Sequence, residues 1–132
     1  MKNRYICPKC RNNINIENNI VLIAKNEFDQ KGIIMLQTKF GDYSTKFSSD
    51  FTIIEGDKVK FLCPVCHANL SNLKNDCLAS FNIIDQSKKE SLLVFSQIYG
   101  EKCTYVIEDK VVKKSFGDDL GKYIDSDWIL LI

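Results

Sequence analysis

The sequence predicts an all-β protein of one domain, residues 1–132, with a single short helix near the C-terminus. The 132 residues fit one domain of ordinary size, and a hydrophobic content of 45% is enough to form a core. Apolar runs of strand length recur along the chain, separated by polar turns that contain glycine or aspartate. Helical periodicity is missing elsewhere, so β-strands are expected to build almost the whole domain.

The apolar runs define the expected strands in order along the chain. They are residues 5–6, 20–24, 33–38, 51–54, 59–62, 78–84, 92–99, 102–108 and 111–114. Residues 20–38 are expected to form an inserted hairpin, because the polar segment between the two apolar runs ends in Gly32. Val59 and Phe61 alternate with Lys60, which is the period of a half-buried strand. The remaining strands should add to the sheet in antiparallel fashion.

The C-terminal segment predicts two further elements. Residues 117–124 are expected to form the short helix, since Asp118 and Asp119 are favourable near a helix N-terminus. The apolar tail, residues 128–132, is expected to be a last strand that closes the sheet. The alternative is that this tail pairs with a second copy of the chain or with a partner by strand addition, which would give a homodimer or a complex.

Four of the six cysteines lie in two Cys-Pro-x-Cys motifs, Cys7 and Cys10 in the first and Cys63 and Cys66 in the second. Two intervening residues allow both sulfur atoms of a motif to face one point, and proline favours the required bend. Two such knuckles supply four soft anionic ligands in a tetrahedron, which suits one structural zinc ion. We therefore expect these four cysteines to be the metal ligands.

The two motifs belong to a weak internal repeat. Residues 5–10 match residues 61–66 position by position, each with an aromatic and an aliphatic residue before the first cysteine. At the same offset, Ile14 matches Leu70 and Leu22 matches Leu78. The repeat predicts two similar half-sites that face each other across one metal ion.

The knuckles resemble those of a rubredoxin-like zinc ribbon, and the chain is similar to small, functionally uncharacterised bacterial proteins built on such a ribbon. Rubredoxins have glycine after the second cysteine of each knuckle, where this sequence has Arg11 and His67. That difference favours structural zinc over iron-based electron transfer. The resemblance implies a partner in a protein or ribonucleoprotein assembly, since many bacterial zinc ribbons serve transcription or translation.

Three other residues are candidates for chemistry, and each also has a purely structural interpretation. His67 could act as a ligand or a base, but a residue in this position more often caps the knuckle or lies at the surface. Cys77 and Cys103 could be reactive thiols, although their strand-like apolar surroundings favour buried and inert side chains. The sequence contains no phosphate loop, nucleophile elbow or His-Glu metal motif.

Charge and hydropathy exclude some classes of function. The net charge is +1, and Arg4 and Arg11 are the only arginines, so nucleic-acid binding is weakly supported. No apolar run reaches the roughly 20 residues of a membrane helix, and no apolar segment at the N-terminus indicates a secretory signal. We therefore expect a cytoplasmic location without membrane association, in which the cysteines stay reduced.

The functional hypothesis from the sequence is a non-enzymatic zinc-binding module that interacts with a protein or ribonucleoprotein assembly. The first alternative is a rubredoxin-like electron carrier with iron bound to the same four thiolates. The second is a cysteine-dependent enzyme that uses Cys77, Cys103 or His67.

Overall fold

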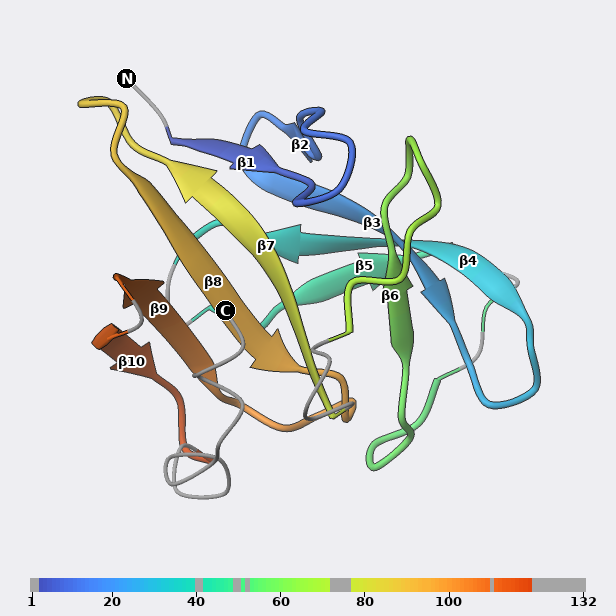
Figure 1. Ribbon diagram of the computed structural model, residues 1–132. Helices are drawn as coiled ribbons and strands as arrows, with labels where there is room; N and C mark the ends of the chain where they lie inside the picture. The colour runs from blue at the N-terminus through green and yellow to red at the C-terminus, as the bar shows by residue number, and fades with distance from the viewer. Residues whose placement is uncertain are drawn as a thin grey trace.

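The computed structural model describes residues 3–39, 42–48, 51, 53–71, 77–109 and 111–119. In this part of the chain every regular element is a strand, which confirms the all-β prediction (Figure 1). Most of the predicted helix and the whole of the predicted C-terminal strand fall in residues 120–132, outside the described residues.

The strands form two antiparallel sheets. The first sheet has the order β2-β3-β4-β5, and β6 pairs with the far end of β3. The second sheet has the order β1-β7-β8-β9-β10. The bounds in the first sheet are β2 Asn15–Ile16, β3 Asn19–Lys25, β4 Lys31–Gln37, β5 Thr45–Phe47 and β6 Lys60–Leu62. Those in the second are β1 Arg4–Ile6, β7 Leu78–Ile84, β8 Glu90–Ser96, β9 Thr104–Glu108 and β10 Val111–Phe116.

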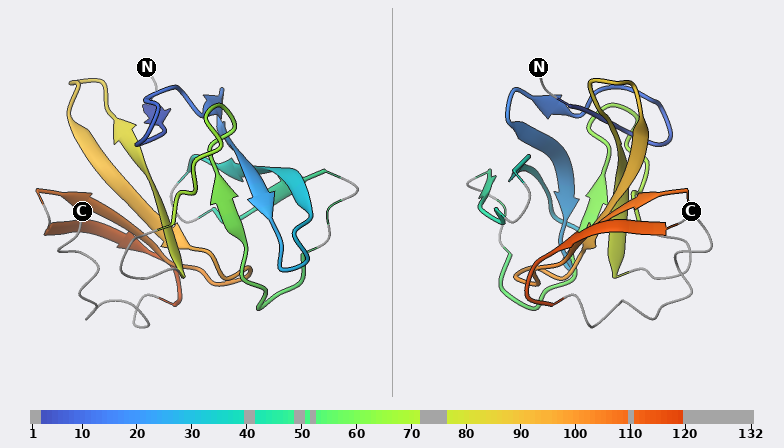
Figure 2. Two further views of the ribbon diagram at one scale, coloured as in Figure 1. Left: turned by 45° about the vertical axis from the view of Figure 1, so that its right-hand side comes forward. Right: turned by 90° about the vertical axis from the view of Figure 1, so that its left-hand side faces the viewer.

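The main hydrophobic core lies between the inner faces of the two sheets (Figure 2). β3 alternates between buried and partly exposed residues, so that Ile20, Leu22 and Ala24 point to this core. Phe81 and Phe95 of the second sheet meet them from the other side. The sheets therefore pack face to face, and the predicted inserted hairpin is the β3–β4 pair.

The internal repeat continues beyond the knuckles in the strand register. The knuckles repeat at an offset of 56, from Cys7 to Cys63, whereas the sheets repeat at an offset of 59. Leu36 pairs with Thr45 in the first sheet, and Phe95 pairs with Thr104 in the second. The units β3-β4-β5 and β7-β8-β9 are therefore equivalent, joined to their knuckles by connections of different length.

The turns of the two repeats also match. In the β3–β4 turn, Asn26 Oδ1 accepts hydrogen bonds from the N–H groups of Phe28 and Gln30. In the β7–β8 turn, Asp85 Oδ1 accepts bonds from the N–H groups of Ser87 and Lys89. The same Asx-type turn thus closes both hairpins.

Each knuckle strand pairs with the hairpin of the other repeat. β1 pairs with β7, with Tyr5 opposite Ile83, while β6 pairs with β3, with Phe61 opposite Ala24. The exchange ties the N-terminal segment to the second sheet and the middle of the chain to the first. Each repeat consequently adds its knuckle strand to the sheet of the other repeat.

Three sequence expectations differ from the structure. Phe51 and Ile53 are buried but belong to no strand, because the N–H groups of Phe51 and Ile54 bond to Ser48 and Asp57 in local turns. Strand β5 was not predicted, since its three residues are too few to show a hydrophobic period. Leu22 corresponds to Phe81 and not to Leu78, because the connection after the second knuckle is longer.

Candidate metal centre

The two knuckles have the same backbone hydrogen bonds. In the first, Cys7 N–H donates to the carbonyl of Asn12 over 3.0 Å, and Arg11 N–H donates to the carbonyl of Cys7 over 3.0 Å. In the second, Cys63 N–H donates to Ala68 over 3.0 Å, and His67 N–H donates to Cys63 over 2.9 Å. The repeat seen in the sequence therefore corresponds to one local fold formed twice.

Arg11 and His67 have backbone φ angles of 64° and 63°. These are the two positions at which rubredoxins have glycine, and the left-handed conformation is the reason that glycine suits them. The knuckles keep that conformation with non-glycine residues, at a cost of roughly 1 kcal/mol each. Both positions therefore adopt the conformation that glycine takes most easily, although neither is a glycine.

Backbone N–H groups point at the first sulfur of each knuckle. Cys7 Sγ accepts bonds from Lys9 N–H at 3.3 Å and Cys10 N–H at 3.5 Å. Cys63 Sγ accepts bonds from Val65 N–H at 3.3 Å and Cys66 N–H at 3.5 Å. Such donors stabilise a thiolate, since they place positive partial charge beside the buried anion.

The exchange of strands brings the knuckles together, and all four Sγ atoms lie within 4.8 Å of one another. Cys7 Sγ is 3.8 Å from Cys66 Sγ, and Cys10 Sγ is 3.7 Å from Cys63 Sγ. A tetrahedron with metal–sulfur bonds of about 2.3 Å has sulfur–sulfur edges of about 3.8 Å. The four cysteines are thus arranged as a zinc-ribbon-like site that can hold one metal ion.

The cysteines of this centre differ in acidity before a metal binds. Hydrogen bonds from the backbone and side chain of Asn12 lower the pKa of Cys10 to about 6. Burial raises the pKa of Cys63 to about 12 and also raises the pKa of Cys7. Cys10 therefore loses its proton more readily than Cys7 and Cys63, which release protons as a metal binds.

Access to the centre is uneven. Cys7 and Cys63 are both 0% exposed, whereas Cys10 is partly exposed and Cys66 is exposed. One sulfur of each knuckle is therefore enclosed by protein and the other lies toward the surface.

An ion pair braces the first knuckle against the second sheet. Arg11 Nη2 and Nη1 donate to the carboxylate of Glu90 over 2.6 and 3.1 Å, and the side-chain amide of Asn82 donates to the same carboxylate. The hydrogen bond from Arg11 is the main cause that holds the pKa of Glu90 below its usual value. This contact links β8 to the residue that follows Cys10, a pairing for which the sequence gives no signal.

The other candidate residues lie outside the cysteine cluster. His67 is exposed, and its backbone closes the second knuckle. Cys103 is 1% exposed in a second hydrophobic cluster on the outer face of the second sheet, and Cys77 packs partly buried against the same cluster. Among the described residues, only the four knuckle cysteines form a group that could ligate a metal.

No protein-family model, curated protein or solved structure matches this chain. Within the described residues, no helix has the length and apolar character needed to cross a bilayer. The class of protein is therefore defined by the fold and the site alone, as a two-sheet β-protein with a cluster of four cysteines that can hold a metal ion between its repeats.

Proposed function

We propose that this protein is a zinc-binding, non-enzymatic module that docks on a protein or ribonucleoprotein assembly. The observation that carries the metal part is the cluster of four thiols from two repeats, all within 4.8 Å of one another and with two Sγ–Sγ distances of 3.7 and 3.8 Å. Four protein ligands leave no open coordination position, so the metal supplies folding energy and not a reactive water.

Zinc fits this donor set because it prefers four soft ligands in a tetrahedron. Iron suits the same geometry, and the exposed Cys66 would give an electron-transfer partner a path to it. The protein purified without added metal is expected to contain one zinc per chain and to be colourless, as measured by elemental mass spectrometry and visible absorption. One iron per chain with thiolate-to-metal absorption would instead support the electron carrier.

The interaction part of the proposal rests on the outer face of the first sheet. Strand register places Ile33, Ile23 and Leu62 in one row across β4, β3 and β6, with Met35 and Val21 in the next row. All five are apolar, none is buried, and Ile33 is 45% exposed. We call these five residues the outer apolar face. An apolar surface of this kind is typical of an interaction site.

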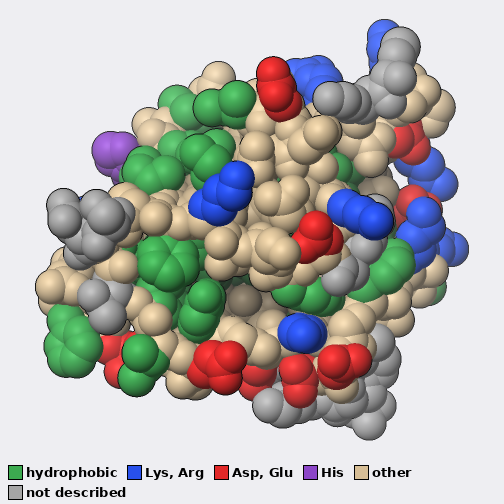
Figure 3. Space-filling model, turned by 180° about the vertical axis from the view of Figure 1, so that it is seen from behind, with side chains coloured by type: hydrophobic (Ala, Val, Ile, Leu, Met, Phe, Trp, Pro, Cys, Tyr) green, Lys and Arg blue, Asp and Glu red, His purple; other side chains and the backbone are tan. Residues whose placement is uncertain are grey.

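The equivalent face of the second sheet is covered. Val94 and Tyr105, which correspond to Met35 and Lys46, are both 0% exposed in the second hydrophobic cluster. The space-filling view shows exposed hydrophobic side chains gathered on the half of the molecule that carries the histidine (Figure 3). The outer face of the sheet is thus exposed in the first repeat and buried in the second. A bound partner protein would bury this face in the first repeat as well.

A substitution on the outer apolar face tests the docking proposal. Ile33→Asp is expected to abolish capture of a partner from native lysate, because it places a charge at the centre of the surface. Lys113→Asp, on the exposed edge strand β10, is the control and should leave capture unchanged. Nuclease treatment of the lysate distinguishes a protein partner from a ribonucleoprotein. Absence of any stable partner, or equal capture by the wild type and Ile33→Asp, would contradict the proposal.

A further inference from the structure

A cavity of about 290 Å³ opens between the two sheets, separate from the four cysteines. Its walls are mostly apolar. The apolar part of the lining includes Ile34, Leu36, Phe61, Phe81, Leu93 and Phe95, and polar and charged residues complete it. This volume lies at the lower end of the range for small-molecule sites, which starts at about 300 Å³.

Equivalent segments of both repeats build the cavity. Leu36 and Phe95 occupy matching positions at the ends of β4 and β8, and Thr45 and Thr104 match at the starts of β5 and β9. Both the cavity and the metal centre therefore lie where the two repeats meet. The cavity belongs to the architecture of the fold and not to one irregular loop.

The repeats differ at the rim of the cavity. At one matching pair of positions, the first repeat has Tyr43 and the second has Lys102, and both residues line the cavity. Tyr43 Oη bonds to Thr104 Oγ1 at 3.0 Å and donates to the carbonyl of Phe116 at 3.0 Å, so its hydroxyl is already engaged. Tyr43 is therefore held in place as part of the cavity wall, whereas Lys102 contributes a positive charge.

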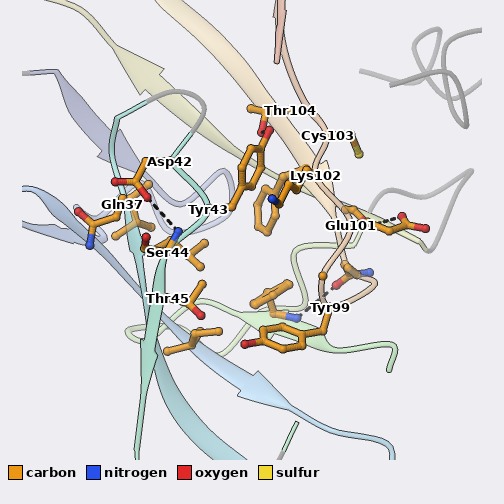
Figure 4. A pocket seen from close by; sticks show the side chains of 18 of the residues that line it. Gln37, Asp42, Tyr43, Ser44, Thr45, Tyr99, Glu101, Lys102, Cys103 and Thr104 are labelled. Atoms are coloured by element: carbon orange, nitrogen blue, oxygen red, sulfur yellow. Dashed lines mark hydrogen bonds between the residues drawn. The ribbon is translucent and has the colours of Figure 1, made fainter. Parts of the chain in front are cut away.

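Lys102 is held in place by its backbone. Its N–H donates to Asp119 Oδ2 at 2.8 Å, and its carbonyl accepts from Asp119 N–H at 2.9 Å. Among the described residues, no carboxylate forms an ion pair with the Lys102 ammonium group. Figure 4 shows Tyr43, Thr45, Tyr99 and Lys102 around the open space.

Three carboxylates line the cavity, those of Asp42, Glu55 and Glu101, and two of them have hydrogen-bond partners. Asp42 Oδ1 accepts a bond from Ser44 N–H at 3.0 Å, and Glu101 Oε1 accepts one from Ser96 Oγ at 2.7 Å. Glu101 also points away from the open space in the close-up view (Figure 4). The cavity lining therefore carries charges of both signs, and its two lysines, Lys39 and Lys102, could pair with an anion.

We propose that this cavity binds a small amphipathic carboxylate, with its apolar body between the two sheets and its carboxylate at Lys102. The apolar walls exclude a wholly polar ligand, because its buried groups would lack hydrogen-bond partners. The Lys102 ammonium group at the rim can pair with an anion, which a neutral or cationic ligand does not offer. The small volume restricts the apolar part to a short acyl chain or a single ring. This proposal does not rest on the identity of the metal or on the docking surface.

Decanoate is a suitable probe, with decanol of equal chain length as the neutral comparison. Isothermal titration calorimetry on the metal-loaded full chain is expected to give one saturable site for decanoate, and binding should raise the melting temperature. Decanol should bind the wild-type protein up to about fivefold more weakly than decanoate does, as expected for a partly exposed ion pair. Decanoate should bind the variant Lys102→Met more weakly than the wild type by the same factor. Higher salt should reduce the difference between decanoate and decanol.

A cavity-filling variant tests the location. Thr45 pairs with Leu36 and shares its inward face, so Thr45→Phe should abolish saturable binding. Lys46 pairs with Met35 on the outer face, so Lys46→Phe and Lys46→Met are matched controls that should keep wild-type affinity. Metal content and melting temperature verify that each variant is folded. No saturable binding to the wild type, equal affinity for decanol, or full affinity in both Thr45→Phe and Lys102→Met would overturn the proposal.

Discussion

Cys63→Ser should abolish metal binding and leave most of the chain unfolded. The Cys63 sulfur is enclosed, accepts two backbone N–H bonds and lies 3.7 Å from Cys10 Sγ. Binding of structural zinc contributes about 10–16 kcal/mol in small zinc domains. A domain of this size has a total stability of about 5–15 kcal/mol. Loss of one of four ligands therefore removes a contribution as large as the whole stability of the protein.

The matched control is Cys77→Ser, which replaces a cysteine outside the metal cluster. Cys77 is partly buried at the edge of the second hydrophobic cluster, so the change should cost about 1 kcal/mol and preserve the metal. Elemental analysis, circular dichroism and thermal melting measure both variants, and a strong chelator added to the wild type should reproduce the effect of Cys63→Ser. A Cys63→Ser protein with wild-type metal content and melting temperature would contradict the metal centre.

The effect should be global because of where the knuckles are attached. Cys7 follows β1, which is an edge strand of the second sheet, and Cys63 follows β6, which lies beside β3 in the first. A metal ion bound by the four cysteines would consequently join the two sheets as well as the two knuckles. Loss of the metal releases both short strands, each of only 3 residues, and with them the closure of the core.

The sequence predicted those parts of the site that depend on local chemistry. Two residues between the cysteines, a proline that favours the bend and an aromatic-aliphatic pair before each knuckle are all readable within six residues. The β3–β4 hairpin and the strands β7 and β8 were predicted for the same reason, since apolar runs and turn residues lie close together in the chain. Local signals of this kind therefore identified the four clustered cysteines and the all-β class.

The sequence could not reveal features that depend on pairing between distant segments. The exchange of β1 and β6 between the sheets is set by the fit of Tyr5 and Phe61 into the shared core, and no local pattern records it. The pair of Arg11 with Glu90 joins residues 79 positions apart. The full repeat was hidden by the change of offset after the second knuckle, and the cavity appears only when both repeats are assembled.

Phe81→Ala is expected to destabilise the protein by about 3–5 kcal/mol, the usual cost of removing a buried aromatic ring. Phe81 is 1% exposed, and its ring centroid lies 6.1 Å from that of Tyr5 and 5.6 Å from that of Phe95. The surrounding side chains can fill the space vacated by the Phe81 ring only in part, because the ring already borders the cavity between the sheets. Urea unfolding of metal-loaded protein at equal metal content measures the change.

Phe28→Ala is the matched control, because the same side chain is 82% exposed there and its removal should change stability by no more than about 0.5 kcal/mol. The contact between Phe81 and Tyr5 adds a second expected effect. Tyr5 lies in β1 two residues before Cys7, so a loosened β1 should also make the metal easier to extract with a chelator. A variant that lost stability but kept wild-type metal retention would show that the first knuckle is positioned by the metal and the brace from Arg11, and not by the aromatic core.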